Sequence, residues 1–129
     1  MDKGIIIIGK ALSGKTRLAN GLVKNQDAKK VCFIDGKLFK KESFPFRNCT
    51  KETKFIIIDD LINIDVIKGF YNTIPQGHLL VDSPNQAIFS IYIDQLILVF
   101  DESITIGNLP KDASFLRRFK IIDLNATIQ

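Results

Sequence analysis

The sequence has none of the features that mark a membrane or secreted protein. No apolar stretch is long enough to span a bilayer, which excludes a membrane-spanning helix. Met1-Asp2-Lys3 leads directly into an apolar run, so no targeting segment is expected. The only cysteines, Cys32 and Cys49, lack the spacing of metal ligands. These absences favour the reducing cytoplasm and no membrane partner, with Cys32 as a buried thiol in an apolar run.

Repeats and low-complexity segments are also absent, and the composition is that of an ordinary globular protein. Hydrophobic residues make up 46% of the 129 residues and charged residues 25%, which excludes a disordered chain. We therefore expect a single domain over residues 1–129. The net charge of +4 suits an anionic ligand or nucleic acid but identifies neither.

The most informative segment comes directly after the apolar run at residues 5–8. It matches the pattern G-x-x-x-x-G-K-[ST] of a phosphate loop, placed between an expected strand and an expected helix. Loops of this kind curl so that their backbone N–H groups point at a nucleotide phosphate. The alternative is a purely structural glycine turn. The residues expected to bind the nucleotide are Gly9, Lys10, Ala11, Leu12, Ser13, Gly14, Lys15, Thr16 and Arg17.

Two side chains of this loop have defined chemistry. Lys15 is expected to reach the β- and γ-phosphates and so to be catalytic, and the Thr16 hydroxyl is expected to bind Mg²⁺. The helix that begins near Lys15 directs its positive dipole end at the same anion.

The remaining pattern predicts an α/β fold in which a largely parallel sheet lies between two layers of helices. Apolar strands are expected at residues 5–8, 31–34, 55–58 and 96–100, an alternating last strand at residues 119–124, and a β-hairpin over residues 79–92. Helices are expected at residues 15–24, 61–71 and 113–118. The first helix is expected to turn Leu18, Leu22 and Val23 inward.

Ligands of such folds bind where the carboxyl ends of the strands meet. We expect four clusters at that edge: the phosphate loop, the pair Asp59-Asp60, residues 101–103, and the approach to the last strand. The acidic pair comes after four buried apolar residues and suits the second motif of phosphate-loop enzymes. We assign Asp59 to Mg²⁺ and Asp60 to orienting or deprotonating the attacking water. The alternative is a strand end with solvated acids.

Four segments, in their order along the chain, resemble the core of AAA+ ATPases. Within that superfamily they are most similar to superfamily III helicases and to phage and plasmid primase-helicases. The segments are Gly9 to Thr16, Ile56-Ile57-Ile58-Asp59-Asp60, the strand at residues 96–100, and Phe115-Leu116-Arg117-Arg118-Phe119.

This resemblance implies a five-stranded sheet of order 5-1-4-3-2 with a β-hairpin inserted before the fourth strand. It also implies ATP and Mg²⁺ as cofactors, and a role in DNA replication or in mobile elements. Arg117 or Arg118 would supply a catalytic arginine finger to a neighbouring copy of the chain, because a guanidinium is planar and always charged. The alternative is two solvated arginines beside a strand.

Two departures from the family pattern bear on hydrolysis. The tip of the fourth strand usually carries Asn, Thr or Ser, whereas here Asp101 and Glu102 come before Ser103. Carboxylates beside a polyphosphate are repulsive unless a cation pairs with them. The chain stops soon after the fifth strand, so no helical lid domain is expected.

The sequence leaves three functions open. The first is a minimal ATPase core, the second a binding module that holds nucleotide without turning it over, and the third a small kinase. The kinase would need an arginine-rich lid, which the basic residues 37–47 do not resemble. Nucleic acid is a further candidate partner, through Lys29, Lys30, Lys37, Lys40 and Lys41.

Overall fold

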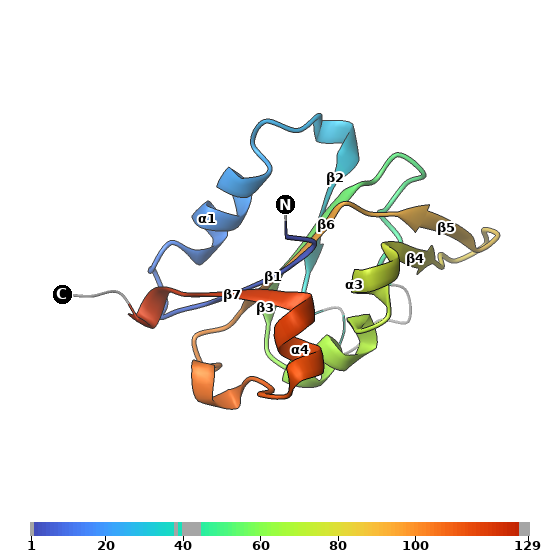
Figure 1. The fold of residues 1–129 in the computed structure, drawn as a ribbon. Helices are drawn as coiled ribbons and strands as arrows, with labels where there is room; N and C mark the ends of the chain where they lie inside the picture. Colours follow the sequence, from blue (N-terminus) through green and yellow to red (C-terminus); the bar gives the residue numbers. More distant parts are fainter. Residues whose placement is uncertain (1, 38, 40–44, 127–129) are drawn as a thin grey trace.

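Five parallel strands form the central sheet of the computed structural model, which describes residues 2–37, 39 and 45–126 (Figure 1). The strands are β1 (Gly4–Ile8), β2 (Val31–Asp35), β3 (Phe55–Leu61), β6 (Gln95–Phe100) and β7 (Phe119–Asp123). They lie side by side in the order β2-β3-β6-β1-β7, and every neighbouring pair is parallel. Without the hairpin strands, this is the predicted order 5-1-4-3-2.

The central strands are covered on both faces, as their runs of β-branched residues predict. Every residue of β1 and β6 is buried. Because side chains alternate along a strand, Ile5 and Ile7 belong to one core cluster and Ile6 and Ile8 to the other. Cys32, at 6% exposure, is buried as predicted.

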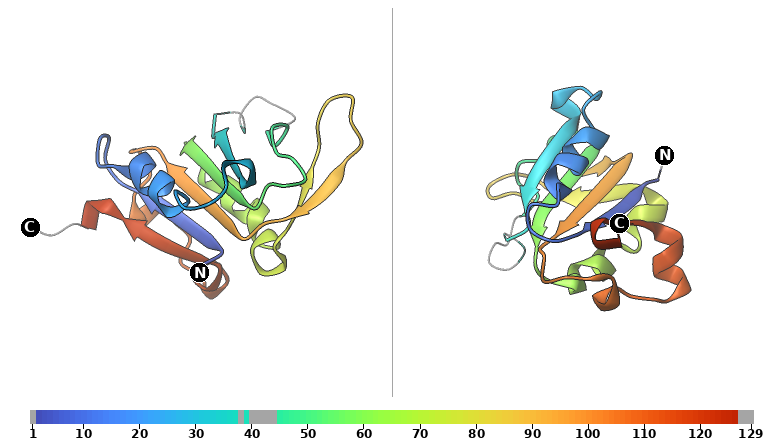
Figure 2. Two further views of the ribbon diagram at one scale, coloured as in Figure 1. Left: turned by 90° about the horizontal axis from the view of Figure 1, so that it is seen from above. Right: turned by 90° about the vertical axis from the view of Figure 1, so that its left-hand side faces the viewer.

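Helices lie on both faces of the sheet, which confirms the three-layer α/β architecture (Figures 1 and 2). α1 (Lys15–Leu22) covers one face, where Ala19 and Val23 join the smaller core cluster. The other face carries the short helices α3 (Thr73–Gln76) and α4 (Ala113–Arg118), with Ile74 and Phe115 in the larger cluster. No helix among the described residues is long and apolar enough to cross a bilayer.

The first helix is shorter than predicted, and one of its expected inner residues faces outward. It ends at Leu22 rather than near residue 24, and Leu22 is 39% exposed. Ala19 and Val23 are four residues apart and share the buried face. The prediction for Leu22 was therefore wrong, and Leu18 packs only partly against the core.

The helix predicted over residues 61–71 was also wrong. β3 continues to Leu61, which pairs with Phe100, and a 3₁₀ helix then spans Ile64–Phe70. The apolar residues Ile64, Ile67 and Phe70 are three apart, which is the repeat of a 3₁₀ helix. This spacing brings Ile67 and Phe70 into the core, and a 3.6-residue repeat would not align them as well.

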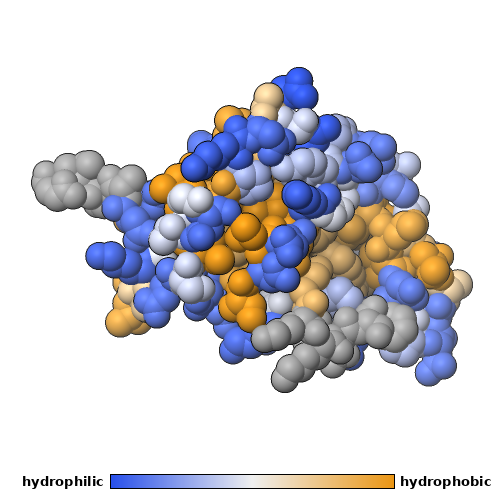
Figure 3. All heavy atoms as spheres, turned by 90° about the horizontal axis from the view of Figure 1, so that it is seen from below, coloured by the Kyte–Doolittle hydropathy of each residue, from blue (hydrophilic) through white to orange (hydrophobic). Residues whose placement is uncertain are grey.

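The predicted β-hairpin is present as a separate two-stranded sheet of β4 (His78–Val81) and β5 (Phe89–Tyr92). The strands pair antiparallel, with His78 opposite Tyr92. One face packs on the core, while Leu80 and Ile88 are 60% and 59% exposed. The space-filling view shows apolar residues gathered at this end of the molecule (Figure 3).

Candidate functional site

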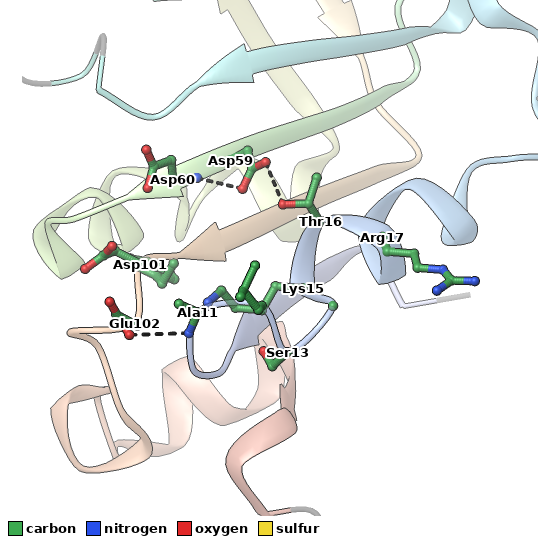
Figure 4. Close-up of a pocket in the computed structure, with 12 residues that line it drawn as sticks. Ala11, Ser13, Lys15, Thr16, Arg17, Asp59, Asp60, Asp101 and Glu102 are labelled. Atoms are coloured by element: carbon green, nitrogen blue, oxygen red, sulfur yellow. Dashed lines mark hydrogen bonds between the residues drawn. The ribbon is translucent and has the colours of Figure 1, made fainter.

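The loop of residues 9–16 connects β1 to α1 at the side of the sheet formed by the C-terminal ends of its parallel strands. A pocket of about 470 Å³ opens there (Figure 4). The tips of β3 and β6 form the side of the pocket that faces the loop. The lining residues are Ala11, Leu12, Ser13, Gly14, Lys15, Thr16, Arg17, Asp59, Asp60, Phe100, Asp101 and Glu102. The structure therefore brings together three of the four clusters expected at this edge.

The loop has the curled backbone that its glycines predict. Gly14 stands at the N-terminus of α1 with a φ of 94°, a conformation that L residues rarely adopt. Leu12 takes the same left-handed region at φ 63° without being glycine, and its side chain is 104% exposed. At Gly9 an added Cβ would lie 2.6 Å from Ser13 Oγ and 3.0 Å from Leu124 Cβ, so a side chain there would displace these neighbours.

Lys15 lies against the loop itself. Its ammonium donates hydrogen bonds to the carbonyl oxygens of Gly9 and, at 3.1 Å, Lys10. The charge is therefore held beneath the first half of the loop, inside the pocket. Arg17, in the first turn of α1, extends away from the other labelled side chains (Figure 4).

Thr16 and Asp59 are in direct contact. The Thr16 hydroxyl donates a hydrogen bond of 2.9 Å to Asp59 Oδ2, and Asp59 Oδ1 accepts one of 2.8 Å from the Asp60 amide. A hydroxyl that donates to a carboxylate keeps its lone pairs for a cation, so the pair offers the hard oxygen ligands that Mg²⁺ prefers. No group of three or more His, Cys, Asp or Glu residues able to hold a metal occurs among the described residues. Mg²⁺ at a phosphate site needs only one or two carboxylates, because phosphate and water supply the rest.

An irregularity at the tip of β3 directs the two carboxylates of the acidic pair differently. The pairing of β3 with β6 shifts register between Ile58 and Leu61, and Asp60 has a φ of 62°. Gly36, just after β2, donates its N–H to the Asp59 carbonyl. A Cβ at Gly36 would lie 2.6 Å from that carbonyl oxygen, so the glycine permits the close approach that fixes this tip.

Asp60 is paired with Lys37 at 3.1 Å, and both side chains are partly exposed. The pKa of Lys37 is raised, first by its hydrogen bond and charge interaction with Asp60 and then by the charges of Asp35 and Asp101. Sequence reasoning assigned Lys37 to a basic surface and missed this pairing. A signal for it existed, because the predicted strand order places β2 beside β3, and Lys37 and Asp60 both lie close to the end of a strand.

The tip of β6 carries two more carboxylates into the pocket. Asp101 accepts a hydrogen bond of 3.0 Å from the Ser103 amide. Hydrogen bonds from the Ser103 hydroxyl and amide, with a smaller contribution from the charge of Lys15, hold the pKa of Asp101 below its ordinary value. Glu102 Oε2 accepts a 3.4 Å hydrogen bond from the Ala11 amide. Ser103 is not among the lining residues.

A second loop amide is also engaged from a distant segment. The Lys10 N–H donates a hydrogen bond of 3.0 Å to Asn125 Oδ1, and Asn125 lies just after β7. Sequence reasoning missed Asn125, since nothing in its local pattern distinguishes it from an ordinary polar residue at the end of a strand. Glu102 and Asn125 thus both bind backbone donors of the loop.

Arg117 and Arg118 lie at the N-terminal ends of the strands, away from the pocket at the C-terminal ends. The expectation that the approach to the last strand lines the ligand site was therefore wrong. The two arginines end α4 just before β7, whose first residue, Phe119, pairs with Gly4 at the start of β1. Arg118 Nε and one terminal nitrogen donate to the carbonyl oxygens of Tyr71 and Ser114, at 2.8 and 3.0 Å. In one copy of the chain neither arginine reaches the loop, and a finger contributed to a neighbouring copy stays a prediction.

Of the basic residues considered for nucleic acid, the three that the structure describes do not form one patch. Lys29 and Lys30 are exposed in the 3₁₀ helix Ala28–Lys30 before β2, and Lys37 comes after β2. The five-residue strand separates them by about 16 Å. Lys40 and Lys41, and part of the segment compared with a kinase lid, lie outside the described residues.

Solved structures share this fold. The apo structure of the NrS-1 C-terminal region matches with a TM-score of 0.67 at 17% identity, over 95% of this chain and 29% of that one. A crystal structure of JCV helicase matches with a TM-score of 0.64 at 13% identity, over 94% of this chain and 35% of that one. The chain has a helicase-like fold.

The likeness concerns the fold, and it covers only part of those proteins. The chain spans about a third of the length of the solved structures it matches, from 28% to 35%. No protein-family model matches the chain. No curated protein matches it either.

Proposed function

We propose that this chain is the nucleotide-binding core of a helicase-like ATPase that works with Mg²⁺. The observation that carries the proposal is the 2.9 Å hydrogen bond from Thr16 to Asp59, at the head of α1 and beside a curled loop. A phosphate-binding loop and an acidic strand tip are the two parts that phosphoryl chemistry requires to meet. They meet here at the edge where ligands of parallel α/β folds bind.

The residues of the loop divide the work of holding a triphosphate. Backbone N–H groups from the loop and the first turn of α1 point at the phosphates, and the helix dipole adds to their attraction. Lys15 leaves the carbonyls of Gly9 and Lys10 and turns its charge to the β- and γ-phosphates. Thr16 and Asp59 would hold Mg²⁺, which when bound neutralises charge on the β- and γ-phosphates.

Asp60 is the residue that we assign to the attacking water. Its carboxylate is held at the tip of β3 by a strained backbone and by Lys37, with 44% of the side chain exposed. An oriented carboxylate accepts a hydrogen bond from water and draws its proton as the oxygen attacks. The ammonium of Lys37 offsets the repulsion between the Asp60 carboxylate and the phosphates.

An arginine for the transition state would come from a second copy of the chain. Arg117 is exposed at the N-terminal ends of the strands, away from the pocket. A homo-oligomer in which this end of one copy meets the pocket of the next would bring Arg117 to the neighbour's nucleotide. Such residues raise phosphoryl-transfer rates by roughly 10³- to 10⁵-fold. Activity that rises steeply with protein concentration would support this arrangement.

The central test is the loss of the Lys15 charge. Calorimetric titration with Mg²⁺ and a non-hydrolysable ATP analogue should give tight binding to the wild type and none that is measurable to Lys15→Ala. Lys24→Ala removes the same charge just beyond the other end of α1 and should bind as the wild type does. Equal affinity of all three proteins would refute the assignment.

A binding module without turnover is the second candidate, and the position of Glu102 favours it. The tip of β6 carries Asp101 and Glu102, whereas the family that the sequence resembles has Asn, Thr or Ser there, and Glu102 lies on the Ala11 amide. Release of ADP at high protein concentration, measured with and without single-stranded DNA, separates the two. Nucleotide binding without ADP release in either condition would support the binding module. ADP release that increases with DNA would establish both the ATPase activity and nucleic acid as a partner.

A further inference from the structure

Glu102 differs from the other carboxylates of the pocket in what it binds. Asp59 accepts hydrogen bonds from Thr16 and the Asp60 amide, and Asp60 pairs with Lys37. Asp101 is capped by Ser103. Glu102 instead accepts its hydrogen bond from Ala11, a backbone donor of the loop itself, 91 residues away along the chain.

The contact joins two elements that the sheet already holds side by side. β1 and β6 are neighbours in register, so the loop that leaves β1 and the turn that leaves β6 emerge next to each other. Figure 4 shows the Glu102 side chain directed at the Ala11 amide from the tip of β6, on the same side of the pocket as Asp101. The Glu102 carboxylate therefore occupies a backbone donor of a loop whose pattern is typical of phosphate binding.

The charge balance of the pocket makes this anion significant. The lining residues include two cations, Lys15 and Arg17, and four carboxylates. Arg17 extends away from the loop, which leaves Lys15 as the lining cation inside the pocket (Figure 4). Each negative charge that a ligand adds is therefore repelled by the excess of carboxylates at the ends of β3 and β6.

The position of Lys15 indicates which part of a nucleotide meets Glu102. Its ammonium lies on the carbonyls of Gly9 and Lys10, immediately before Ala11. This lysine serves the β- and γ-phosphates in loops of this pattern, so the terminal phosphates come to the Ala11 side of the loop. A third phosphate adds one more negative charge at the end of the pocket where Glu102 stands.

We propose that Glu102 is a specificity-determining residue that weakens binding of nucleoside triphosphates relative to diphosphates, by holding a carboxylate on the Ala11 amide beside the terminal phosphate. The proposal rests on the proposed function and deepens it. A triphosphate enters only when Glu102 leaves the amide or accepts the repulsion. A diphosphate ends short of this position and is affected much less.

The test compares two ligands on matched variants. Affinities for ADP and for a non-hydrolysable ATP analogue, both with Mg²⁺ and at one salt concentration, are measured by calorimetry. The variants are Glu102→Gln, which keeps the oxygen acceptor without its charge, and Glu102→Ala, which removes both. The control is Glu52→Gln, which makes the same charge change in the exposed turn before β3, at the opposite edge of the sheet.

Glu102→Gln and Glu102→Ala should each tighten the triphosphate analogue by about tenfold or more, since one like charge within a few ångströms is removed. Their affinity for ADP should change much less, and Glu52→Gln should alter neither. Equal tightening of both ligands, or none, would overturn the role of Glu102 while the proposed function stands. Failure of every protein, wild type included, to bind either nucleotide would overturn the proposed function and this inference with it.

Discussion

Thr16 and Asp59 are 43 residues apart in the chain, and the hydroxyl of one donates a 2.9 Å hydrogen bond to the carboxylate of the other. The contact exists because β1 and β3 flank β6 in one parallel sheet, so the loop after β1 and the tip of β3 come to the same edge. Asp59 is further fixed by the Asp60 amide at 2.8 Å. The two residues thus form a prearranged oxygen pair.

Asp59→Asn is expected to weaken Mg²⁺ binding to the nucleotide complex by on the order of 10- to 100-fold, the usual effect of altering a group that orients or completes a metal site. Titration of Mg²⁺ into protein preloaded with the ATP analogue measures this. Asp94→Asn, just before β6 at the other edge of the sheet, serves as the control. Unchanged Mg²⁺ affinity in Asp59→Asn would remove Asp59 from the metal site.

Lys37→Met is expected to weaken binding of the triphosphate severalfold, because Asp60 loses the cation that offsets its charge beside the phosphates. The effect should shrink as salt is added, since both side chains of the pair are partly exposed to screening ions. Affinity measured at low and high salt checks both statements. Lys29→Met places the same change before β2 instead of after it, and a similar loss there would show that net charge alone is responsible.

Leu12 and Gly14 both have a positive φ, which is strained for leucine but not for glycine, and substitution should change stability in opposite directions at the two positions. Gly14→Ala should destabilise the fold by about 1–2 kcal/mol, because its φ of 94° is unfavourable for an L residue although no atom lies within 4 Å of the added Cβ. Leu12→Gly should stabilise by up to about 1 kcal/mol, since relief of strain exceeds the added entropy of the unfolded chain. The fully exposed Leu12 side chain loses no packing.

Urea unfolding of the two variants against the wild type gives both differences. A stabilised Gly14→Ala, or a destabilised Leu12→Gly, would mean that the loop backbone differs from the one described.

Asp101 should contribute to stability in a pH-dependent way. Hydrogen bonds from Ser103 hold its folded pKa below the ordinary 3.8, so the ionised form is favoured in the folded state. The stabilisation is therefore present above about pH 4 and is lost as the pH falls through the ordinary value towards the folded one. Thermal unfolding of wild type and Asp101→Asn should show a difference in Tm at about pH 6 that narrows towards about pH 3. A difference that stays constant with pH would contradict this.

We expect Arg118 to stabilise the fold and Arg117 to act in catalysis. Arg118→Ala should destabilise the fold by about 1–3 kcal/mol, because it removes two charged hydrogen bonds to backbone carbonyls and the packing on the Tyr71 ring. Arg117→Ala should leave stability unchanged and lower the ATPase rate only in an oligomer. Unfolding curves and ADP release at several protein concentrations test the pair, and a stable, inactive Arg118→Ala would reverse the assignment.

Much of the fold was predictable from local pattern. Runs of β-branched residues such as residues 5–8 and 55–58 are typical of strands in a sheet covered on both faces, and the resemblance to AAA+ cores supplied their order. The prediction failed where two periodicities compete. The spacing of residues 64, 67 and 70 is compatible with an α-helix or a 3₁₀ helix. In the structure β3 continues to Leu61, and the residues that follow form a 3₁₀ helix.

The sequence by itself determined the chemistry available: a loop with a lysine and a threonine at fixed positions, and acids that end buried strands. These are local properties, because glycine positions and apolar runs act over a few residues. Tertiary structure alone decided two contacts: Glu102 accepts a hydrogen bond from the Ala11 amide, and Arg118 donates one to the Tyr71 carbonyl. Such contacts depend on single backbone angles and on side-chain directions at the ends of the strands, and no local sequence pattern encodes these.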